Sequence, residues 1–369
     1  MGRAMSALEY LTPASNPNLI GHEKAERTFL QACKGQRLHH AWLISGSRGI
    51  GKATLAYRFA RYVFFNFKSD ANLFGNSFDA DKNYDSLNIP QDHPIFQRVA
   101  ARGHADLLVI ERSQNKQGNL SSAIIAEDVR NARNFLHMTA GEGGWRIVII
   151  DSADDMNDHA ANALLKILEE PPPRTLLMLI SHNPGRLLPT IQSRCQRIRL
   201  KPLRKSDLVS WLSAGDLAAS IADPEVISIL AEGSIGRAIE LIELDGVNIY
   251  TDILTLFEGL PIIEARHLHA FASKISSKKS NYTFNLTSEL IRWLLARVIK
   301  YAARGFEEEM TLKEQALFEK IIATNSLDRW LKVWDKVEDL FASADRASLD
   351  RKQVILTTFS FISQASDAQ

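Results

Sequence analysis

A glycine-rich segment that follows a short apolar run limits the folds open to this chain more than any other feature. The run is Ala41 to Ser45, and the segment is Gly46-Ser47-Arg48-Gly49-Ile50-Gly51-Lys52-Ala53-Thr54. In the pattern G-x-x-x-x-G-K-[ST], backbone N–H groups hold phosphates, the lysine reaches the terminal phosphates, and the hydroxyl ligates Mg²⁺. The pattern needs a strand before the loop and a helix after it. The sequence therefore predicts an α/β domain with a phosphate-binding loop, followed by a helix from Ala53 to Phe65.

The loop departs from this pattern at its last position. Ala53 stands where Ser or Thr would supply the hydroxyl, and a methyl group cannot ligate a metal ion. Thr54 follows one residue later, and on a helix one residue corresponds to a rotation of about 100°. We therefore expect Thr54 to point away from the place of the metal. The loop keeps its phosphate-holding glycines and Lys52 but lacks a group that phosphoryl transfer uses.

Further apolar runs alternate with helical patterns in the first two hundred residues. The runs lie at residues 107–110, 146–150, 176–180 and 196–200, and helical spacing covers residues 125–137 and 157–170. Apolar strands that alternate with helices predict a mostly parallel sheet with helices on both faces. This arrangement is the core of a nucleoside-triphosphatase fold.

Strand patterns stop at about residue 201, and helical patterns continue to the C-terminus. We predict three domains: residues 1–201 form the α/β domain, residues 202–245 a small helical lid domain, and residues 246–369 a helical bundle. Two groups with helical core spacing should pack this bundle, and a subunit interface is an alternative for some of them. They are Trp293, Leu294 and Val298, and Trp330, Leu331, Trp334 and Val337.

Composition excludes several classes of protein. The 44 Lys and Arg residues almost balance the 43 Asp and Glu residues, so no overall basic field draws the chain to nucleic acid. Cys33 and Cys195 are the only cysteines, which is too few for a disulfide framework or a four-cysteine zinc site. No signal-peptide pattern and no run of about eighteen apolar residues occurs, so no membrane span is expected. These features favour a cytoplasmic protein.

A second expected motif of such a nucleotide site is present but incomplete. The run 146–150 ends on Asp151, where an acidic residue would organise Mg²⁺. Ser152 follows at the position where a Glu usually orients the attacking water, and a hydroxyl cannot act as a carboxylate base. Asp154 and Asp155 are nearby acids, three and four positions after Asp151. The chain thus lacks two groups that hydrolysis needs most, at Ala53 and at Ser152.

Two longer motifs carry a family resemblance. They are Asn162-Ala163-Leu164-Leu165-Lys166-Ile167-Leu168-Glu169-Glu170-Pro171-Pro172 and Ser193-Arg194-Cys195. They resemble signatures of clamp-loader subunits of the AAA+ superfamily. With the altered loop and the missing Glu, the chain is most similar to the delta-prime class of bacterial DNA polymerase III. The resemblance covers roughly residues 17–245, and in the C-terminal third it depends mainly on residues 348–352.

The resemblance implies specific roles for site residues. Arg194, with Ser193 and Cys195 as its motif, would act as an arginine finger in trans, reaching the γ-phosphate of ATP bound by a neighbouring motor subunit. A guanidinium placed there stabilises charge on the transferring phosphoryl group. A degenerate nucleotide site of this chain would consist of Gly46, Gly49, Gly51, Lys52, Ala53, Thr54 and Asp151.

The resemblance also implies the assembly. The chain would be an ATPase-deficient, comparatively rigid subunit of a pentameric clamp loader held together by a collar of C-terminal domains. Its partners would be the delta subunit and the tau or gamma motor subunits, and it would meet the sliding clamp and primer-template DNA through the complex. No cofactor is required, although weak binding of ATP, ADP or phosphate is open. Zinc is not expected, because residues 66–93 contain no cysteine, and no membrane partner is implied.

Two sensor positions of the family differ here. The phosphate-sensing Arg that follows a Gly-Ser pair in active relatives would fall at Gly236, and Arg237 comes one position late. We therefore expect little nucleotide sensing through the small domain. After the fourth strand, Ser181-His182-Asn183 offers polar groups at the first sensor, with a solvated turn as an equal alternative.

Other interpretations stay open at this stage. The chain could be an active AAA+ ATPase of replication or repair in which Thr54 or Asp154 compensates for the altered positions. It could also be a nucleotide-gated repair or recombination protein that works without a clamp loader. Arg194 could instead cap a helix or pair with a local acid. Arg197, Arg199 and Lys201 share one strand face, and a solvated edge is favoured there over a nucleic-acid interface.

Overall fold

Four apolar runs and the alternating segment Gln196-Arg197-Ile198-Arg199 form the strands of one parallel sheet. The strands are β1 (Ala41–Ser45), β2 (Leu107–Ile110), β3 (Arg146–Ile150), β4 (Thr175–Ser181) and β5 (Gln196–Arg199). They form a five-stranded sheet in the order β2-β3-β4-β1-β5, and each neighbouring pair is parallel. The carboxyl ends of β1, β3 and β4 therefore lie side by side at one edge, which is where open α/β sheets bind ligands.

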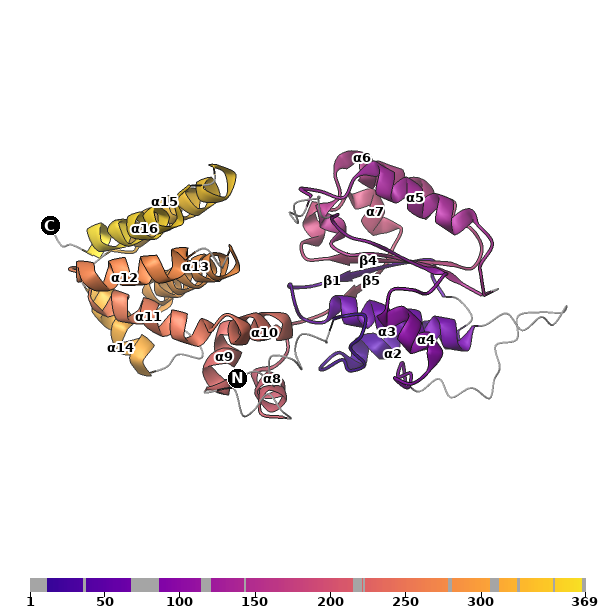
Figure 1. The fold of residues 1–369 in the computed structure, drawn as a ribbon, viewed down its shortest axis with the longest axis horizontal. Coiled ribbons are helices and arrows are strands. Elements are labelled where there is room, and N and C mark those ends of the chain that lie inside the picture. The colour runs from indigo at the N-terminus through magenta and orange to yellow at the C-terminus, as the bar shows by residue number, and fades with distance from the viewer. Residues whose placement is uncertain are drawn as a thin grey trace. The chain divides into compact units, whose positions relative to one another are not determined.

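Helices cover both faces of this sheet, as the sequence predicts (Figure 1). On one face lie α2 (Glu23–Lys34), α3 (Lys52–Asn66) and α4 (Pro94–Ala100), and on the other α5 (Ala126–His137), α6 (Asp158–Glu169) and α7 (Pro189–Ser193). Strand side chains alternate between two cores. Trp42 and Ile44 pack with α2 and α3, whereas Ala41 and Leu43 pack with α5 and α6.

Local signals explain two helix boundaries that matter for the site. The Asn157 side chain accepts a hydrogen bond from the Ala160 amide (2.9 Å) and starts α6. The same helix ends at Glu169, because the residue before Pro171 avoids the helical conformation. Helix α4 has Pro94 in its first turn. The segment is too short for its sequence pattern to predict a helix.

In the described residues directly after the sheet lie α8 (Lys205–Leu212), α9 (Pro224–Ala231) and α10 (Ile235–Glu243). The Asp223 side chain caps α9 by accepting from the Val226 amide at 3.1 Å. Glu232 and Gly233 are both left-handed, with φ of 48° and 74°, and turn the chain between α9 and α10. A Cβ atom at residue 233 would lie 2.5 Å from the Leu203 carbonyl oxygen, so this turn requires glycine.

The C-terminal part is helical, as predicted. Its helices are α11 (Gly246–Glu258), α12 (Ala265–Ser276), α13 (Asn281–Arg304), α14 (Leu312–Ala323), α15 (Leu327–Ala347) and α16 (Arg351–Ser366). Leu294, Val298, Trp330 and Val337 are buried in its core. Leu331 does not pack the core, because it lies beside the buried stripe of α15 and is 42% exposed, so for this residue only the alternative of a subunit interface stays open.

This computed structural model describes residues 12–35, 38–67, 86–113, 121–142, 144–214, 221, 223–277, 281–305, 312–323, 326–347 and 349–366. Within it the chain divides into two compact units, residues 1–237 and 238–369, and the three predicted domains stay a prediction. Most of the cysteine-free segment 66–93 lies outside the described residues. Across the described ranges, no helix is both long and apolar enough to cross a membrane.

Candidate functional site

The phosphate-binding loop lies between β1 and α3, as its sequence predicts. Gly49 and Gly51 adopt left-handed conformations, with φ of 75° and 102°, which glycine adopts without steric cost. Gly51 is the N-cap of α3, and Lys52 is its first residue. The first N–H groups of a helix have no acceptor within the helix, so the start of α3 is suited to an anion.

Each carbonyl oxygen of the loop from Gly46 to Ile50 accepts a hydrogen bond. Lys52 Nζ donates to Gly46 O (2.8 Å) and Ser47 O (2.6 Å), Ser234 Oγ to Arg48 O (2.9 Å), the Gly236 amide to Gly49 O (2.9 Å), and His22 Nε2 to Ile50 O (2.7 Å). These donors come from three separate stretches of the first unit. The peptide groups of the loop are therefore fixed by contacts within the protein.

Lys52 is the charged group of the loop. It is only 3% exposed, and burial lowers its pKa to about 8, with Arg48 acting in the same direction and Asp151 and Asp154 opposing it. At neutral pH the ammonium is still mostly protonated, because a pKa of about 8 lies above 7. Lys52 thus keeps the positive charge that a phosphate group requires.

At the loop position that lacks a hydroxyl, the side chain packs against the core. Ala53 packs against the core under α3, and the neighbouring Thr54 is buried, 8% exposed. Ala53 offers no oxygen to a cation. The expectation that the Thr54 hydroxyl points away from the metal position stays a prediction.

Asp151 directly follows β3. It lies close enough to Lys52 for their charges to interact. Burial raises the pKa of Asp151, the Glu111 carboxylate adds to this, and Lys52 lowers it. Ser152 follows in a left-handed conformation with φ of 63°, which is unusual for a residue other than glycine. Its hydroxyl lies 3.1 Å from His182 Nε2, so the residue at the expected position of the base bonds His182 instead.

Asp154 is occupied by backbone amides. Its two carboxylate oxygens accept from the His182 amide (3.0 Å) and the Asn183 amide (3.1 Å). Burial raises the pKa of Asp154, but these hydrogen bonds outweigh burial and the pKa is lowered. A carboxylate held in this way is a poor proton acceptor. The structure therefore gives no support to Asp154 as a replacement base.

Arg194 belongs to a second cluster, at the end of α7. Its guanidinium donates to Glu169 Oε1 (2.8 Å) and to Thr190 O (3.0 Å), and its side chain is 36% exposed. Ser193 Oγ donates to Thr190 O (3.0 Å). Burial raises the pKa of Cys195 to about 12, so its thiol is a packing group rather than a nucleophile. Arg194 thus makes the local ion pair that the sequence analysis named as an alternative.

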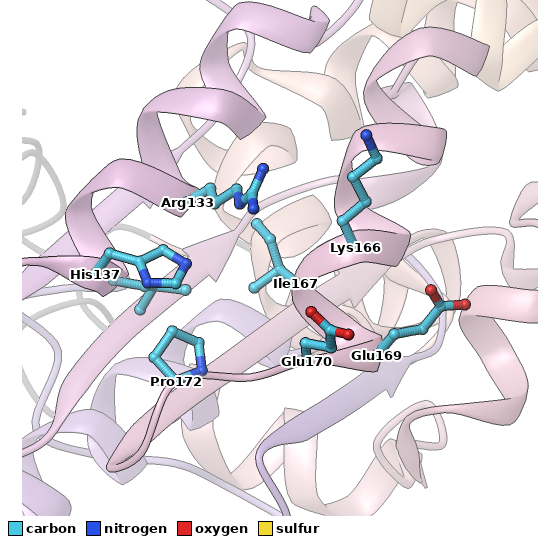
Figure 2. A pocket seen from close by; sticks show the side chains of 8 residues that line it. Arg133, His137, Lys166, Ile167, Glu169, Glu170 and Pro172 are labelled. Carbon is cyan, nitrogen blue, oxygen red and sulfur yellow. The ribbon is translucent and has the colours of Figure 1, made fainter.

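A pocket adjoins this cluster between α5 and α6. It has a volume of about 240 Å³, and Figure 2 shows its lining side chains. They include Arg133, His137, Lys166, Glu169, Glu170 and Pro172. In Figure 2 Glu170 points toward the middle of the pocket, whereas Glu169 points away from it. The two adjacent acids therefore have different surroundings.

Sequence reasoning missed several residues of these two clusters. His22 gives no local signal, since its partner Ile50 lies 28 residues away. Ser234 and Gly236 lie where the sequence predicts little nucleotide sensing, and in the structure they hold the loop. Glu169 lies in the quoted motif, yet only the fold brings it to Arg194. Among the described residues no group of three or more His, Cys, Asp and Glu side chains could hold a metal ion.

Comparison with known proteins places the first unit in a family. A family model described as "DNA polymerase III, delta subunit" matches residues 21–204. DNA polymerase III subunit delta' of Pseudomonas aeruginosa is 38% identical over 156 residues, 42% of this chain and 41% of that protein. Subunit delta' of Escherichia coli is 31% identical over 57% of this chain and 56% of that protein. Subunit gamma of Buchnera aphidicola is 25% identical over 88% of this chain and 81% of that protein.

The chain thus spans about half the length of the two delta' relatives that it matches. Among solved structures, a DNA polymerase III gamma subunit-related protein from Thermotoga maritima is similar, with a TM-score of 0.46 and 18% identity over 93% of this chain and 99% of that one. The relatives include delta', gamma and tau subunits, so the family is settled and the type of subunit is not. Through residues 21–204, this chain belongs to the DNA polymerase III delta-subunit family.

Proposed function

We propose that this chain is a delta-prime-like subunit of a sliding-clamp loader in DNA replication. It does not hydrolyse ATP itself, and it donates Arg194 to the ATP site of a neighbouring motor subunit. The observation that carries this proposal is the state of its own nucleotide site: Ala53 replaces the metal-binding hydroxyl, and Ser152 replaces the base. Phosphoryl transfer depends on positioned Mg²⁺ and an oriented water, and both supporting groups are absent here.

The geometry supports the passive role of the site. Asp154, the nearest acid that could compensate, already accepts two backbone amides. The hydrogen bonds to the loop carbonyls hold the loop in one arrangement. Such a site could still bind ATP, ADP or phosphate weakly, because Lys52 and the loop amides remain. No metal ion or zinc is proposed for it.

The position of Arg194 supports a role in trans. The side chain is part of the surface and extends from an element end that the sheet core fixes. A guanidinium is permanently charged and forms paired hydrogen bonds with phosphate oxygens. In phosphoryl transfer, an arginine supplied by another chain stabilises the charge on the transferring group.

The names of the relatives suggest the partners. They are delta', gamma and tau subunits of DNA polymerase III. We propose that this chain assembles with a delta subunit and with tau or gamma motors through its C-terminal helices. Contacts with the sliding clamp and primer-template DNA would be made by the complex.

Reconstitution tests the proposal. The chain is combined with the delta and motor subunits of the same cell, and ATP turnover is measured with Arg194→Ala and, as a control, with Arg186→Ala, which removes another exposed arginine. We expect Arg194→Ala to slow turnover about 10- to 1000-fold, the range for losing a charge-stabilising donor. We expect Arg186→Ala to leave it unchanged. Equal turnover in both variants would remove the assigned role of Arg194.

A second measurement separates this function from an active ATPase. The isolated chain is assayed for phosphate release with and without Mg²⁺. Measurable Mg²⁺-dependent turnover that disappears in Lys52→Ala would identify the chain as a motor. Failure of the delta and motor subunits to co-purify with the full chain would contradict the assembly.

A further inference from the structure

We propose that Glu169 positions Arg194, holding its guanidinium ready for the phosphate of a neighbouring subunit. This inference rests on the proposed function of Arg194. Glu169 would act only by orienting Arg194, because Glu169 itself would contact no phosphate. The juxtaposition that carries it is the contact between the last residue of α6 and the residue that follows α7.

Two contacts fix the direction of the Arg194 side chain. The Nη2 group donates to Glu169 Oε1 at 2.8 Å, and the Nη1 group donates to Thr190 O at 3.0 Å. The guanidinium carries five N–H donors. In the described part of the chain these two bonds engage one donor on each terminal nitrogen, so donors remain on all three nitrogens. A phosphate could therefore be bound while the arginine keeps its orientation.

Both side chains extend from rigid elements. Glu169 follows the buried Leu168 at the end of α6, and three prolines restrict the backbone directly after Glu170. Arg194 lies between the buried residues Ile191 and Cys195. Leu168, Ile191 and Cys195 all belong to the same core cluster. The two ends of the ion pair are thus anchored in one core and do not move independently.

The exposure of the pair argues for positioning rather than stabilisation. The Arg194 side chain is 36% exposed and that of Glu169 is 49% exposed. Ion pairs at this exposure contribute little to folding. Such a pair still restricts a long flexible side chain, and ordering that side chain beforehand reduces the cost of binding.

The neighbouring Glu170 provides a matched control. It has the same charge, it is also exposed, and it lines the same pocket. Figure 2 shows its carboxylate pointing in a different direction from that of Glu169. Arg194 makes its ion pair with Glu169. If only the negative charge at this helix end mattered, Glu169→Ala and Glu170→Ala would change ATP turnover equally. If Glu169 positions Arg194, only the change at Glu169 should lower turnover.

The experiment measures ATP turnover of the reconstituted complex with Glu169→Ala, Glu169→Gln, Glu170→Ala and Arg194→Ala, and with Glu169→Ala combined with Arg194→Ala. We expect Glu169→Ala to lower kcat about three- to tenfold, the effect of releasing one side chain, with KM for ATP unchanged. Glu169→Gln keeps an acceptor and should lose less. Glu170→Ala should match the wild type. In the Arg194→Ala background, Glu169→Ala should have no further effect, because the two residues act as one unit.

The outcomes separate this inference from the function on which it rests. If Arg194→Ala leaves turnover unchanged, the proposed function fails. If Arg194→Ala slows turnover but Glu169→Ala behaves like Glu170→Ala, or adds its effect independently to that of Arg194→Ala, the positioning role is wrong. A rise in kcat in Glu169→Ala would also overturn it, since Glu169 would then restrain the arginine. Thermal unfolding of each full-length variant, expected to be unchanged, checks that a lowered kcat does not come from misfolding.

Discussion

At the scale of single residues, the nucleotide site combines retained and lost chemistry. Lys52 stays in place, and its ammonium bonds two carbonyl oxygens of its own loop. Ala53 and Ser152 replace the groups that would manage a metal ion and a water molecule. Ser152 has a left-handed backbone, a conformation that costs of order 1–3 kcal/mol and occurs most often at functional sites. The site has thus kept the geometry of a phosphate site without the parts for hydrolysis.

The burial of Lys52 predicts a pH dependence of stability. Burial lowers its pKa from 10.5 to about 8, so between these values the unfolded chain binds more protons than the folded one. The contribution of Lys52 to the free energy of unfolding therefore rises between about pH 8 and pH 10.5. Below about pH 8 the folded chain bears the full cost of burying the charged ammonium. Relative to Lys52→Met, the wild type should gain on the order of 1–3 kcal/mol over this window.

Urea unfolding at pH 7.5, 8.5 and 9.5 measures this difference. Lys24→Met, which removes an exposed lysine of α2, serves as the control for the loss of one positive charge. If wild type and Lys52→Met show parallel dependences on pH, the burial penalty assigned to Lys52 is wrong.

At the scale of elements, the turn between α9 and α10 holds the phosphate loop. The Gly236 amide donates to Gly49 O at 2.9 Å, and Ser234 Oγ donates to Arg48 O at 2.9 Å. The two glycines approach so closely that a Cβ atom on residue 236 would lie 2.8 Å from Gly49 Cα. The family resemblance implies an arginine at residue 236 in nucleotide-sensing relatives. An arginine there would not allow this contact. The loop and the turn therefore form one rigid structure.

Gly236→Ala should destabilise the first unit. Alanine is favoured over glycine in helices by about 1 kcal/mol, but here its methyl group would meet backbone atoms that have no room to move. Overpacking of this kind costs about 1–3 kcal/mol. Because the substitution lies in the first turn of α10, the clash should outweigh the gain, giving a net loss of about 1 kcal/mol or more. Chemical denaturation of the full chain measures it.

Gly103→Ala is the matched control for this variant. A Cβ atom at residue 103 would meet only the Arg98 carbonyl oxygen, at 3.9 Å, and its backbone is not left-handed. Gly103→Ala should leave the free energy of unfolding unchanged or raise it slightly. Equal stability of the two variants would mean that the loop and the turn separate readily, against the close contact described above.

At the scale of the whole molecule, each unit has a core of its own. The first unit buries two clusters on the faces of its sheet. The second unit buries Trp330, which is 0% exposed, together with aromatic residues such as Phe257 and Phe359, whose rings lie 5.9 Å apart. Two of its buried polar groups pair with one acid inside the unit: the Tyr250 hydroxyl bonds Glu314, and Arg297 lies 3.8 Å from the same carboxylate. Each unit can therefore lose stability separately.

Trp330→Ala should test this separation. Removing a fully buried tryptophan side chain costs about 3–5 kcal/mol, so amide protection in α13 and α15 should fall steeply. Protection in β1, β3 and β4 should stay unchanged. Hydrogen exchange resolved by segment measures both, and Leu331→Ala, at a neighbouring position that is 42% exposed, should stay within about 0.5 kcal/mol of the wild type. Equal loss of protection in both units would show that they unfold as one.

Several elements could be predicted from the sequence because their signals are local. The buried strands are continuous apolar runs, the phosphate loop is a fixed pattern of glycines before Lys52, and α6 has Asn157 before it and Pro171 after it. Helix α4 was missed because its seven residues give too short a pattern. Helical spacing did not separate the exposed Leu331 from the buried residues of α15, because spacing alone does not mark the edge of a buried stripe.

The sequence by itself determined the class of fold, the glycine-rich loop before Lys52, and the residues Ala53 and Ser152 on which the proposed loss of hydrolysis rests, since each depends on residue type at short spacing. Only the tertiary structure decided which distant residues meet. The strand order puts the ends of β1, β3 and β4 together, His22 and Ser234 reach the loop from other elements, and Glu169 contacts Arg194 across 25 residues of chain. The physical reason is that these contacts depend on how helices pack on the sheet, and no short stretch of sequence contains that information.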